Sequence, residues 1–365
     1  MKKHLLFMFL VCTITTGVLA QTEEGSFNPT IKVKALVHSR YDMSLTDSVD
    51  ISNKYSDDAL MSNFRMRRIE MRSDMKLTEK WSGVVRIQLP ELKGSSPGKV
   101  IELAYVQYKH SDALQIMAGQ FKVPYELDEL TSHEDLRMIE RGTTSSLIVS
   151  QSLASYQPGI MIFGKFMKET TPLNYYFAIV NGSNRAVNND INDQKNVAGR
   201  LEYSFTKGIR LGVNAQQAFA KDESSTSYGV DLSIQQKLSD KTKLIVEGEY
   251  IVAPNVNAFL ADTSGLDFSN FDLSGYFGQA LLRFDINKSW CRTFEVGGKY
   301  ETTDPLTDVD GNSFSTITGT VGFIFLPDND ARLQFNIIHT DWESAISPGG
   351  IMASNIFSAQ FQVKI

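Results

Sequence analysis

Cysteine is nearly absent from this sequence. One of its two cysteines, Cys12, lies in an N-terminal apolar stretch, which leaves Cys291 alone in the rest of the chain. We therefore expect no intrachain disulfide framework, and the fold must be stabilised in another way. Lipid attachment at Cys12 is disfavoured because Leu10 and Val11, rather than small residues, precede it.

Long hydrophobic runs are also missing after residue 20. The apolar runs there are short, as with Phe323 to Leu326, whereas a membrane-spanning helix needs about 18 apolar residues. If the chain lies in a membrane, it must do so as a closed barrel of strands. Charge of one sign does not dominate either, since the formal net charge is only -6. This balance excludes a basic nucleic-acid-binding protein.

The first twenty residues have the composition of a secretory signal. Lys2 and Lys3 are followed by an apolar run from Leu5 to Cys12, and small residues precede Gln21. We predict cleavage before Gln21, so that residues 1–20 form a signal peptide and residues 21–365 a single mature domain.

Hydrophobic residues alternate with polar ones along nearly the whole mature chain, which indicates an all-β fold. At the C-terminus, Phe357, Phe361 and Val363 fall on one face and Ser358 and Gln362 on the other. The pattern predicts sixteen strands, near residues 31–41, 63–76, 80–90, 100–110, 113–122, 158–168, 173–182, 196–206, 208–220, 226–237, 241–254, 273–286, 291–301, 314–325, 331–342 and 353–365.

The connections between these strands alternate between long and short, except for a short one at 221–225. Bacterial outer-membrane barrels have long extracellular loops and tight periplasmic turns, whereas a soluble β-sandwich has no reason to separate them. The sequence therefore predicts a transmembrane antiparallel β-barrel of about sixteen strands with both termini in the periplasm. A soluble, exported sandwich is the less favoured alternative, although its strands would alternate in the same way.

Arginine is concentrated in one predicted strand, from Phe64 to Arg72, and Arg86 follows in the next. If Ile69 and Met71 face lipid, then Arg68 and Arg72 face the lumen. Arg65 and Arg67 have the opposite parity, so a β-bulge is needed to bring them inward. Arginines along the lumen would attract anions, because the guanidinium binds oxyanions and stays charged. Bracing of the wall by ion pairs with lumenal carboxylates is an equally good interpretation.

The third long connection, residues 123–157, is too long for an ordinary loop and has a helical pattern around Leu127, Leu130, Leu136 and Ile139. Folded into the lumen, this loop would narrow the pore and place Arg137 and Arg141 opposite the arginine-rich wall. A surface lid or an adhesive loop is the alternative.

Enzyme signatures are absent. The mature chain has four histidines, His38, His110, His133 and His339, and no zinc-protease, serine-hydrolase or phosphate-binding motif. Asp308, Asp310 and Asn312 resemble the start of a calcium loop but lack its final glutamate. We expect no catalysis, no cofactor and no metal ion.

The segment Gly119-Gln120-Phe121-Lys122-Val123-Pro124-Tyr125 resembles the phosphate-selective porin O and P family, in which a similar segment leads into the constriction loop. Further likeness lies in Phe64 to Arg72, Glu102 to Tyr108, Ile139-Glu140-Arg141 and Val180-Asn181-Gly182. The resemblance implies a trimeric outer-membrane barrel whose basic residues line an anion path. It departs at Tyr156-Gln157-Pro158-Gly159, where only the glycine of the family's pattern remains. The pore-wall candidates it implies are Arg65, Arg67, Arg68, Arg72, Lys122 and Arg141.

Taken together, the residues and the resemblance predict a passive porin for small hydrophilic solutes, with a possible preference for anions such as phosphate. Its expected partners are outer-membrane lipid, the permeating solute and two further copies of the chain. The pore-lining candidates are Arg65, Arg67, Arg68, Arg72, Arg86, Lys122, Arg137 and Arg141. The main alternative is a receptor or adhesin barrel that is plugged by the long loop and binds a ligand without conducting. An outer-membrane hydrolase is less favoured, because we locate no serine and histidine that would converge.

Overall fold

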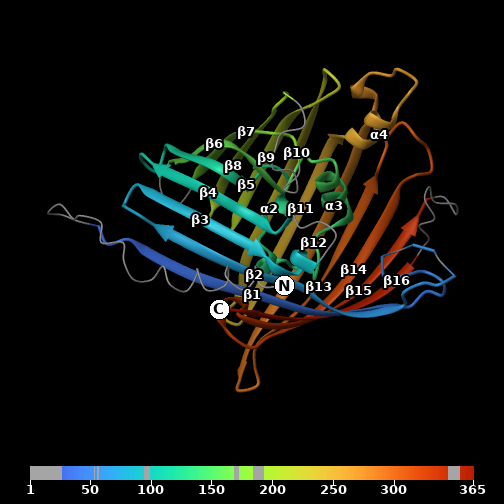
Figure 1. Ribbon diagram of the computed structural model, residues 1–365. Helices are drawn as coiled ribbons and strands as arrows, with labels where there is room; N and C mark the ends of the chain where they lie inside the picture. Colours follow the sequence, from blue (N-terminus) through green and yellow to red (C-terminus); the bar gives the residue numbers. More distant parts are fainter. Residues whose placement is uncertain are drawn as a thin grey trace, which may run out of the picture.

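Sixteen antiparallel strands close into one barrel (Figure 1). The computed structural model describes residues 27–52, 54–55, 57–93, 99–167, 172–183, 193–343 and 354–365, so the predicted signal peptide lies outside the described residues. The strands are β1 (Thr30–Ser44), β2 (Ser62–Lys76), β3 (Trp81–Gln88), β4 (Ile101–Lys109), β5 (Gln115–Lys122), β6 (Tyr156–Phe166), β7 (Leu173–Val180), β8 (Asn196–Thr206), β9 (Ile209–Ala220), β10 (Glu223–Ser239), β11 (Thr242–Pro254), β12 (Asp272–Lys288), β13 (Cys291–Asp304), β14 (Phe314–Ile324), β15 (Ala331–Trp342) and β16 (Ser354–Lys364).

Each strand pairs with its sequence neighbours, and β1 pairs with β16 to close the ring. Closure leaves no unpaired sheet edge, as a barrel in lipid requires. The predicted barrel of sixteen strands is confirmed, and every strand begins and ends within three residues of its predicted bounds.

The alternation of side chains separates two environments. In β16, Ser358, Gln360 and Gln362 point inward and are buried, whereas Phe361 is 44% exposed on the outer surface. Apolar side chains on the outside and polar ones on the inside are the arrangement of a barrel that faces lipid. The period-two pattern of the sequence therefore indicates which face of each strand points to the lumen.

The links between strands also separate by length. Short turns such as 207–208, 240–241 and 289–290 lie at one end, where β1 begins and β16 ends, and long loops such as 45–61 and 255–271 lie at the other. The exception is again the link from β9 to β10, where Lys221 and Asp222 form a two-residue turn with φ values of 47° and 66°. Two consecutive positive φ angles are the geometry of a tight hairpin turn.

The predicted bulge is present in β2. His38 of β1 lies opposite Arg68, but the next residue, Ser39, lies opposite Met66, so Arg67 is the extra residue. Beyond the bulge Phe64 and Met66 point outward, with 81% and 47% of their surfaces exposed. Because the bulge reverses the parity of β2, Arg65, Arg67 and Arg68 can all lie on the lumenal side.

The connection between β5 and β6, residues 123–155, lies inside the barrel, and we call it the lumenal segment. It contains the helices α2 (Leu127–Leu130) and α3 (Thr143–Ser150), which Figure 1 shows within the ring of strands. The helical prediction is correct for α2 but wrong for residues 136–141, and it missed α3. None of the helices in the described parts of the chain is long and apolar enough to cross a membrane.

Candidate functional site

Three guanidiniums of the barrel wall converge on one carboxylate of the lumenal segment. Glu140 lies 2.7 Å from Arg40 of β1 and, through β2, 2.5 Å from Arg67 and 2.7 Å from Arg68. Arg40 and Arg68 are buried, and the bulge at Arg67 is what places two consecutive arginines on this side. We call Arg40, Arg67, Arg68 and Glu140 the arginine latch, because they fasten the segment to the wall.

The charges of the latch control the protonation of Glu140. Burial by itself would raise the pKa of this carboxyl, but the nearby guanidiniums of Arg68, Arg67 and Arg40 hold it well below the ordinary value of 4.5. Glu140 is therefore ionised at neutral pH. The latch then combines three positive charges with one negative charge.

Carboxylates on β11 and β13 hold the lumenal segment by its backbone. Both carboxylate oxygens of Glu249 in β11 accept from the backbone N–H of Leu127, at 2.9 and 3.0 Å. Glu301 in β13 accepts from Thr143 and Thr144 at 3.0 and 2.8 Å, and so caps the N-terminus of α3. A carboxylate is favoured there because it satisfies free N–H groups and interacts well with the helix dipole. We call Glu249 and Glu301 the carboxylate wall.

A second glutamate of the segment, Glu126, is buried beside the carboxylate wall. It has a φ of 71°, an unfavourable value for a residue with a side chain, and it accepts from the N–H groups of Asp128 and Glu129 and from the Ser145 hydroxyl. Burial, followed by the charges of Glu249, Asp128 and Glu129, raises the pKa of Glu126 well above 4.5. Glu126 therefore differs from Glu140 in holding its proton more tightly than a free glutamate.

The other predicted arginines of β2 and β3 are also paired with carboxylates. Arg65 lies 2.8 Å from Asp42, Arg72 lies 2.6 Å from Asp74, and Arg86 lies 2.9 Å from Glu102 while its guanidinium also bonds Tyr156. Ion pairs of this kind brace the wall, whatever their effect on permeating ions.

Lys122, Arg137 and Arg141 bind the segment to itself and to the wall. Lys122 donates to the carbonyl of Glu129, and Arg137 bonds Glu247 of β11 at 2.9 Å, on the far side from the arginine latch. Arg141 was predicted to lie opposite the arginine-rich wall. It bonds Glu129 at 3.0 Å and lines the same cavity as Arg67 and Arg68.

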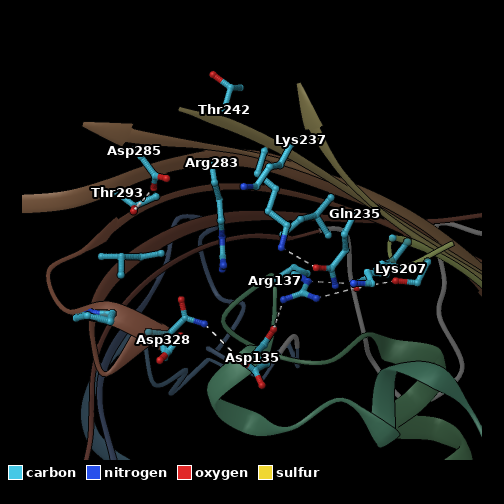
Figure 2. A pocket seen from close by; sticks show the side chains of 18 of the residues that line it. Asp135, Arg137, Lys207, Gln235, Lys237, Thr242, Arg283, Asp285, Thr293 and Asp328 are labelled. Carbon is cyan, nitrogen blue, oxygen red and sulfur yellow. Dashed lines mark hydrogen bonds and ion pairs between the residues drawn. The ribbon is translucent and has the colours of Figure 1, made fainter. Parts of the chain in front are cut away.

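The lumenal segment separates cavities at the two ends of the barrel. A cavity of 500 Å³ lies toward the long loops, where Arg67, Glu91 and Lys99 line it. A larger cavity of 830 Å³ lies toward the short turns and includes Lys207, Lys237 and Asp240 in its lining. Figure 2 shows the larger cavity, with Arg137 and Asp135 of the lumenal segment on one side and Lys237 and Arg283 on the strands.

Several residues of this site were missed from the sequence alone. Arg40 completes the latch, and Arg332 of β15 donates to the carbonyl of Leu136 at 2.8 Å. The signal for Arg40 was its position between His38 and Asp42, on the polar face of an alternating strand. No local feature of the sequence distinguishes Arg332, because its role depends on where the lumenal segment docks in the folded barrel.

Comparison with known proteins agrees with this geometry. The family model described as phosphate-selective porin O and P matches residues 41–268, which cover the arginine-rich strand, the lumenal segment and the strands from β3 to β11. The chain belongs to the phosphate-selective porin O and P family. A search of curated protein sequences returned no significant match.

Solved structures of outer-membrane porins and channels share the fold of this porin. The anion-selective porin from Comamonas acidovorans superposes with a TM-score of 0.61 at 10% identity, covering 93% of this chain and 100% of that one. The DcaP channel of Acinetobacter baumannii gives 0.58 at 12% identity, over 93% and 98% of the two chains. The trimer form of OmpT from Vibrio cholerae gives 0.57 at 7% identity, over 93% and 100%.

Family and fold together identify an outer-membrane porin channel. The resemblance found in the sequence is confirmed, as is the predicted channel function. Cavities lie on both sides of the lumenal segment, and a channel requires such space.

Proposed function

We propose that this porin conducts small anions, including phosphate-like oxyanions, in preference to cations of similar size. The observation that carries the proposal is the lining of the 830 Å³ cavity. Although the whole chain has a net charge of -6, eight basic and five acidic side chains line this cavity. The basic ones are Arg137, Lys207, Arg210, Lys237, Lys243, Arg283, Arg292 and Lys364.

An excess of fixed positive charge within a narrow lumen raises the local concentration of anions and lowers the barrier to their passage. The arginine latch adds to this excess, because three guanidiniums face a single carboxylate. In this proposal Arg65, Arg72 and Arg86 brace the wall through their ion pairs. The basic residues that line the cavities provide the attraction, Arg67, Arg68, Lys122, Arg137 and Arg141 among them.

Single-channel recording in planar bilayers tests the preference. In a KCl gradient the reversal potential should show that chloride permeates more easily than potassium, and added phosphate should reduce the chloride current by competition. Cation-selective steps would overturn the proposal. A correctly folded barrel without conductance would favour the receptor alternative.

A pair of variants sharpens this test. Lys237→Gln with Lys243→Gln removes two charges from the 830 Å³ cavity. Attraction over roughly 8 Å in a water-like dielectric is worth about 0.5 kcal/mol per charge, so the anion-to-cation permeability ratio should fall by about twofold for each. Lys241→Gln is the matched control, since Lys241 is exposed on the adjacent turn and does not line this cavity. An equal loss of selectivity in the control would mean that the rim, and not the cavity, sets the preference.

We also propose that the mature chain begins at Gln21 and forms a homotrimer with both termini in the periplasm. The alternation of short and long links supports this orientation, and a similar fold occurs in the trimer form of Vibrio cholerae OmpT. Mass spectrometry of the exported protein should give an N-terminus at Gln21. Light scattering in detergent should give three chains, and a monomeric mass would contradict the trimer.

A further inference from the structure

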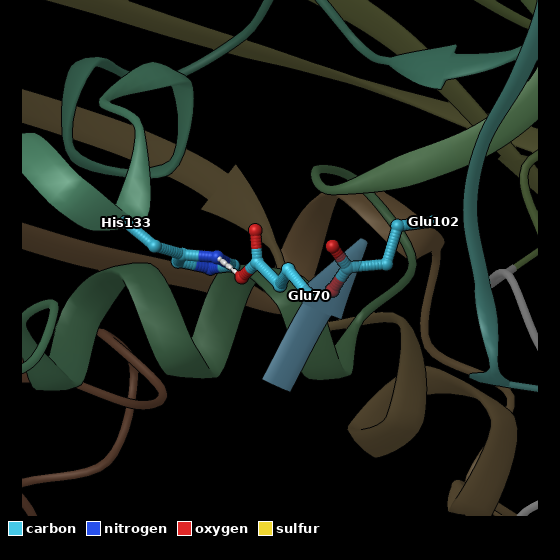
Figure 3. Close-up of side chains that lie close together, drawn as sticks. All are labelled: Glu70, Glu102 and His133. Atoms are coloured by element: carbon cyan, nitrogen blue, oxygen red, sulfur yellow. Dashed lines mark hydrogen bonds and ion pairs between the residues drawn. The ribbon is translucent and has the colours of Figure 1, made fainter. Parts of the chain in front are cut away.

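Two carboxylates and an imidazole meet beneath the lumenal segment. Glu70 of β2, Glu102 of β4 and His133 of the lumenal segment each offer one ligand atom, and these atoms lie within 4.8 Å of one another. All three side chains are buried. In Figure 3, Glu70 lies between the His133 ring, which bonds it, and the carboxylate of Glu102.

This set of side chains matches the ligands that zinc-class ions take in proteins. An imidazole nitrogen and carboxylate oxygens bind Zn²⁺ at about 2.0–2.2 Å, so that neighbouring ligand atoms lie about 3.4 Å apart. The three groups need only small side-chain rotations to reach that spacing. The imidazole favours a transition metal over Ca²⁺ or Mg²⁺, which prefer sites made only of oxygen atoms.

The surroundings suit a metal site in two respects. Arg86 lies 2.9 Å from Glu102 and 3.6 Å from Glu70, and so can orient both carboxylates from behind. Glu102 and His133 also line the 500 Å³ cavity on the side of the long loops. An ion can therefore reach the site from the extracellular side and keep a water molecule as its fourth ligand. The positive charges of Arg68, Arg141, Lys122 and Arg86 act on His133 and lower the expected affinity.

We propose that Glu70, Glu102 and His133 form a binding site for a divalent transition metal of the zinc class. The bound ion replaces the proton shared by His133 and Glu70, and so joins the lumenal segment to β2 and β4 through metal–ligand bonds. This proposal does not rest on the anion preference, because its ligands bind a cation, although Glu102 and His133 line the same cavity as Arg67 and Arg68.

Calorimetric titration of the detergent-folded protein with ZnCl₂, in a buffer without phosphate, tests the proposal. The wild type should show one saturable site, and His133→Ala and Glu102→Gln should each weaken it at least tenfold. His110→Ala is the matched control, because His110 is exposed on the turn between β4 and β5. Equal affinity in the wild type and His133→Ala, or no saturable binding in the wild type, would overturn the proposal.

A spectroscopic measurement guards against variants that fail to fold. Co²⁺ bound to the wild-type barrel by an imidazole and two carboxylates should give visible absorption bands that excess Zn²⁺ removes and excess Ca²⁺ leaves. Absence of such bands in a folded wild-type barrel would mean that the three residues form a buried hydrogen-bonded cluster only.

Discussion

Glu126 and Glu140 belong to the same lumenal segment, yet their environments are opposite. Glu140 is surrounded by three guanidiniums, which hold its pKa well below 4.5. Glu126 is buried near Glu249, Asp128 and Glu129, and its pKa is raised well above 4.5. Glu140 is therefore held to the barrel by charge, whereas Glu126 favours its neutral form and accepts hydrogen bonds from within the segment.

The difference shows how the polar part of the segment is fixed inside a wide lumen, beside the apolar cluster that Tyr125, Ile148 and Leu153 join. Charge pairs fasten the segment where the wall is basic, and backbone N–H groups meet carboxylates where the wall is acidic. Buried polar groups need partners on every side, and the two walls supply complementary kinds. The two attachments should therefore respond differently to mutation, pH and salt.

Removal of the latch carboxylate should have the largest effect. Glu140→Ala leaves Arg40 and Arg68 buried without their counter-charge, which should destabilise the docked segment by about 3 kcal/mol. Thermal unfolding in detergent should shift downward, and single-channel traces should become noisier and more anion-selective. Asp310→Asn, in an exposed loop, is the control. Unchanged unfolding in Glu140→Ala would show that the latch does not hold the segment.

The two glutamates should give pH dependences of opposite sign. The folded pKa of Glu126 is raised, so the stability it contributes is fully present below pH 4.5 and is lost as pH rises through the raised pKa. The folded pKa of Glu140 is depressed, so its contribution is present above pH 4.5 and is lost as pH falls through the lowered pKa. A tenfold difference in proton affinity between the folded and unfolded chain corresponds to roughly 1.4 kcal/mol of stability.

Thermal unfolding measured from about pH 2 to about pH 10 separates these contributions. Glu126→Gln keeps an acceptor for Ser145 and removes the ionisation, so it should flatten the loss of stability on the alkaline side. Glu140→Gln should flatten the loss on the acid side. If both variants altered the same side of the profile, the assignment of opposite environments would be wrong.

A smaller effect is expected at the cap of α3. Glu301→Gln keeps one acceptor oxygen but loses the charge that faces Thr143 and Thr144, and loss of a helix cap typically costs about 1 kcal/mol. Hydrogen exchange of the α3 amides should become faster in this variant, while exchange in the barrel strands stays unchanged. Exchange that is equally fast in the wild type would mean that Glu301 does not cap the helix.

A higher salt concentration should produce the smallest effect, a decline in the anion preference. Raising KCl from 0.1 to 1 M shortens the screening length from about 10 Å to about 3 Å, so the anion preference measured by reversal potential should decline. The hydrogen bonds from the Leu127 backbone to Glu249 should not respond to salt, so protection of the Leu127 amide should persist. Selectivity that is independent of salt would point to pore size instead of charge.

The sequence alone was enough to predict the barrel, because each strand has one face toward lipid and one toward the lumen. The same parity argument located the bulge, since Arg67 and Arg68 could not both face inward without it. The docking of the lumenal segment could not be predicted in this way. Helix α3 has the sequence Thr-Thr-Ser-Ser-Leu-Ile-Val-Ser, which is a poor helix former, and its cap is Glu301, more than 150 residues away. His133 and Glu70 likewise meet only through the fold.

The contacts of the lumenal segment also link it to the closure of the barrel. The segment comes from the first half of the chain, yet Arg332 and Gln362 donate to its carbonyls from β15 and β16, and Arg40 does so from β1. These side chains come together only when the first and last strands have paired. The full set of contacts that holds the segment in the lumen is therefore complete only in the closed ring.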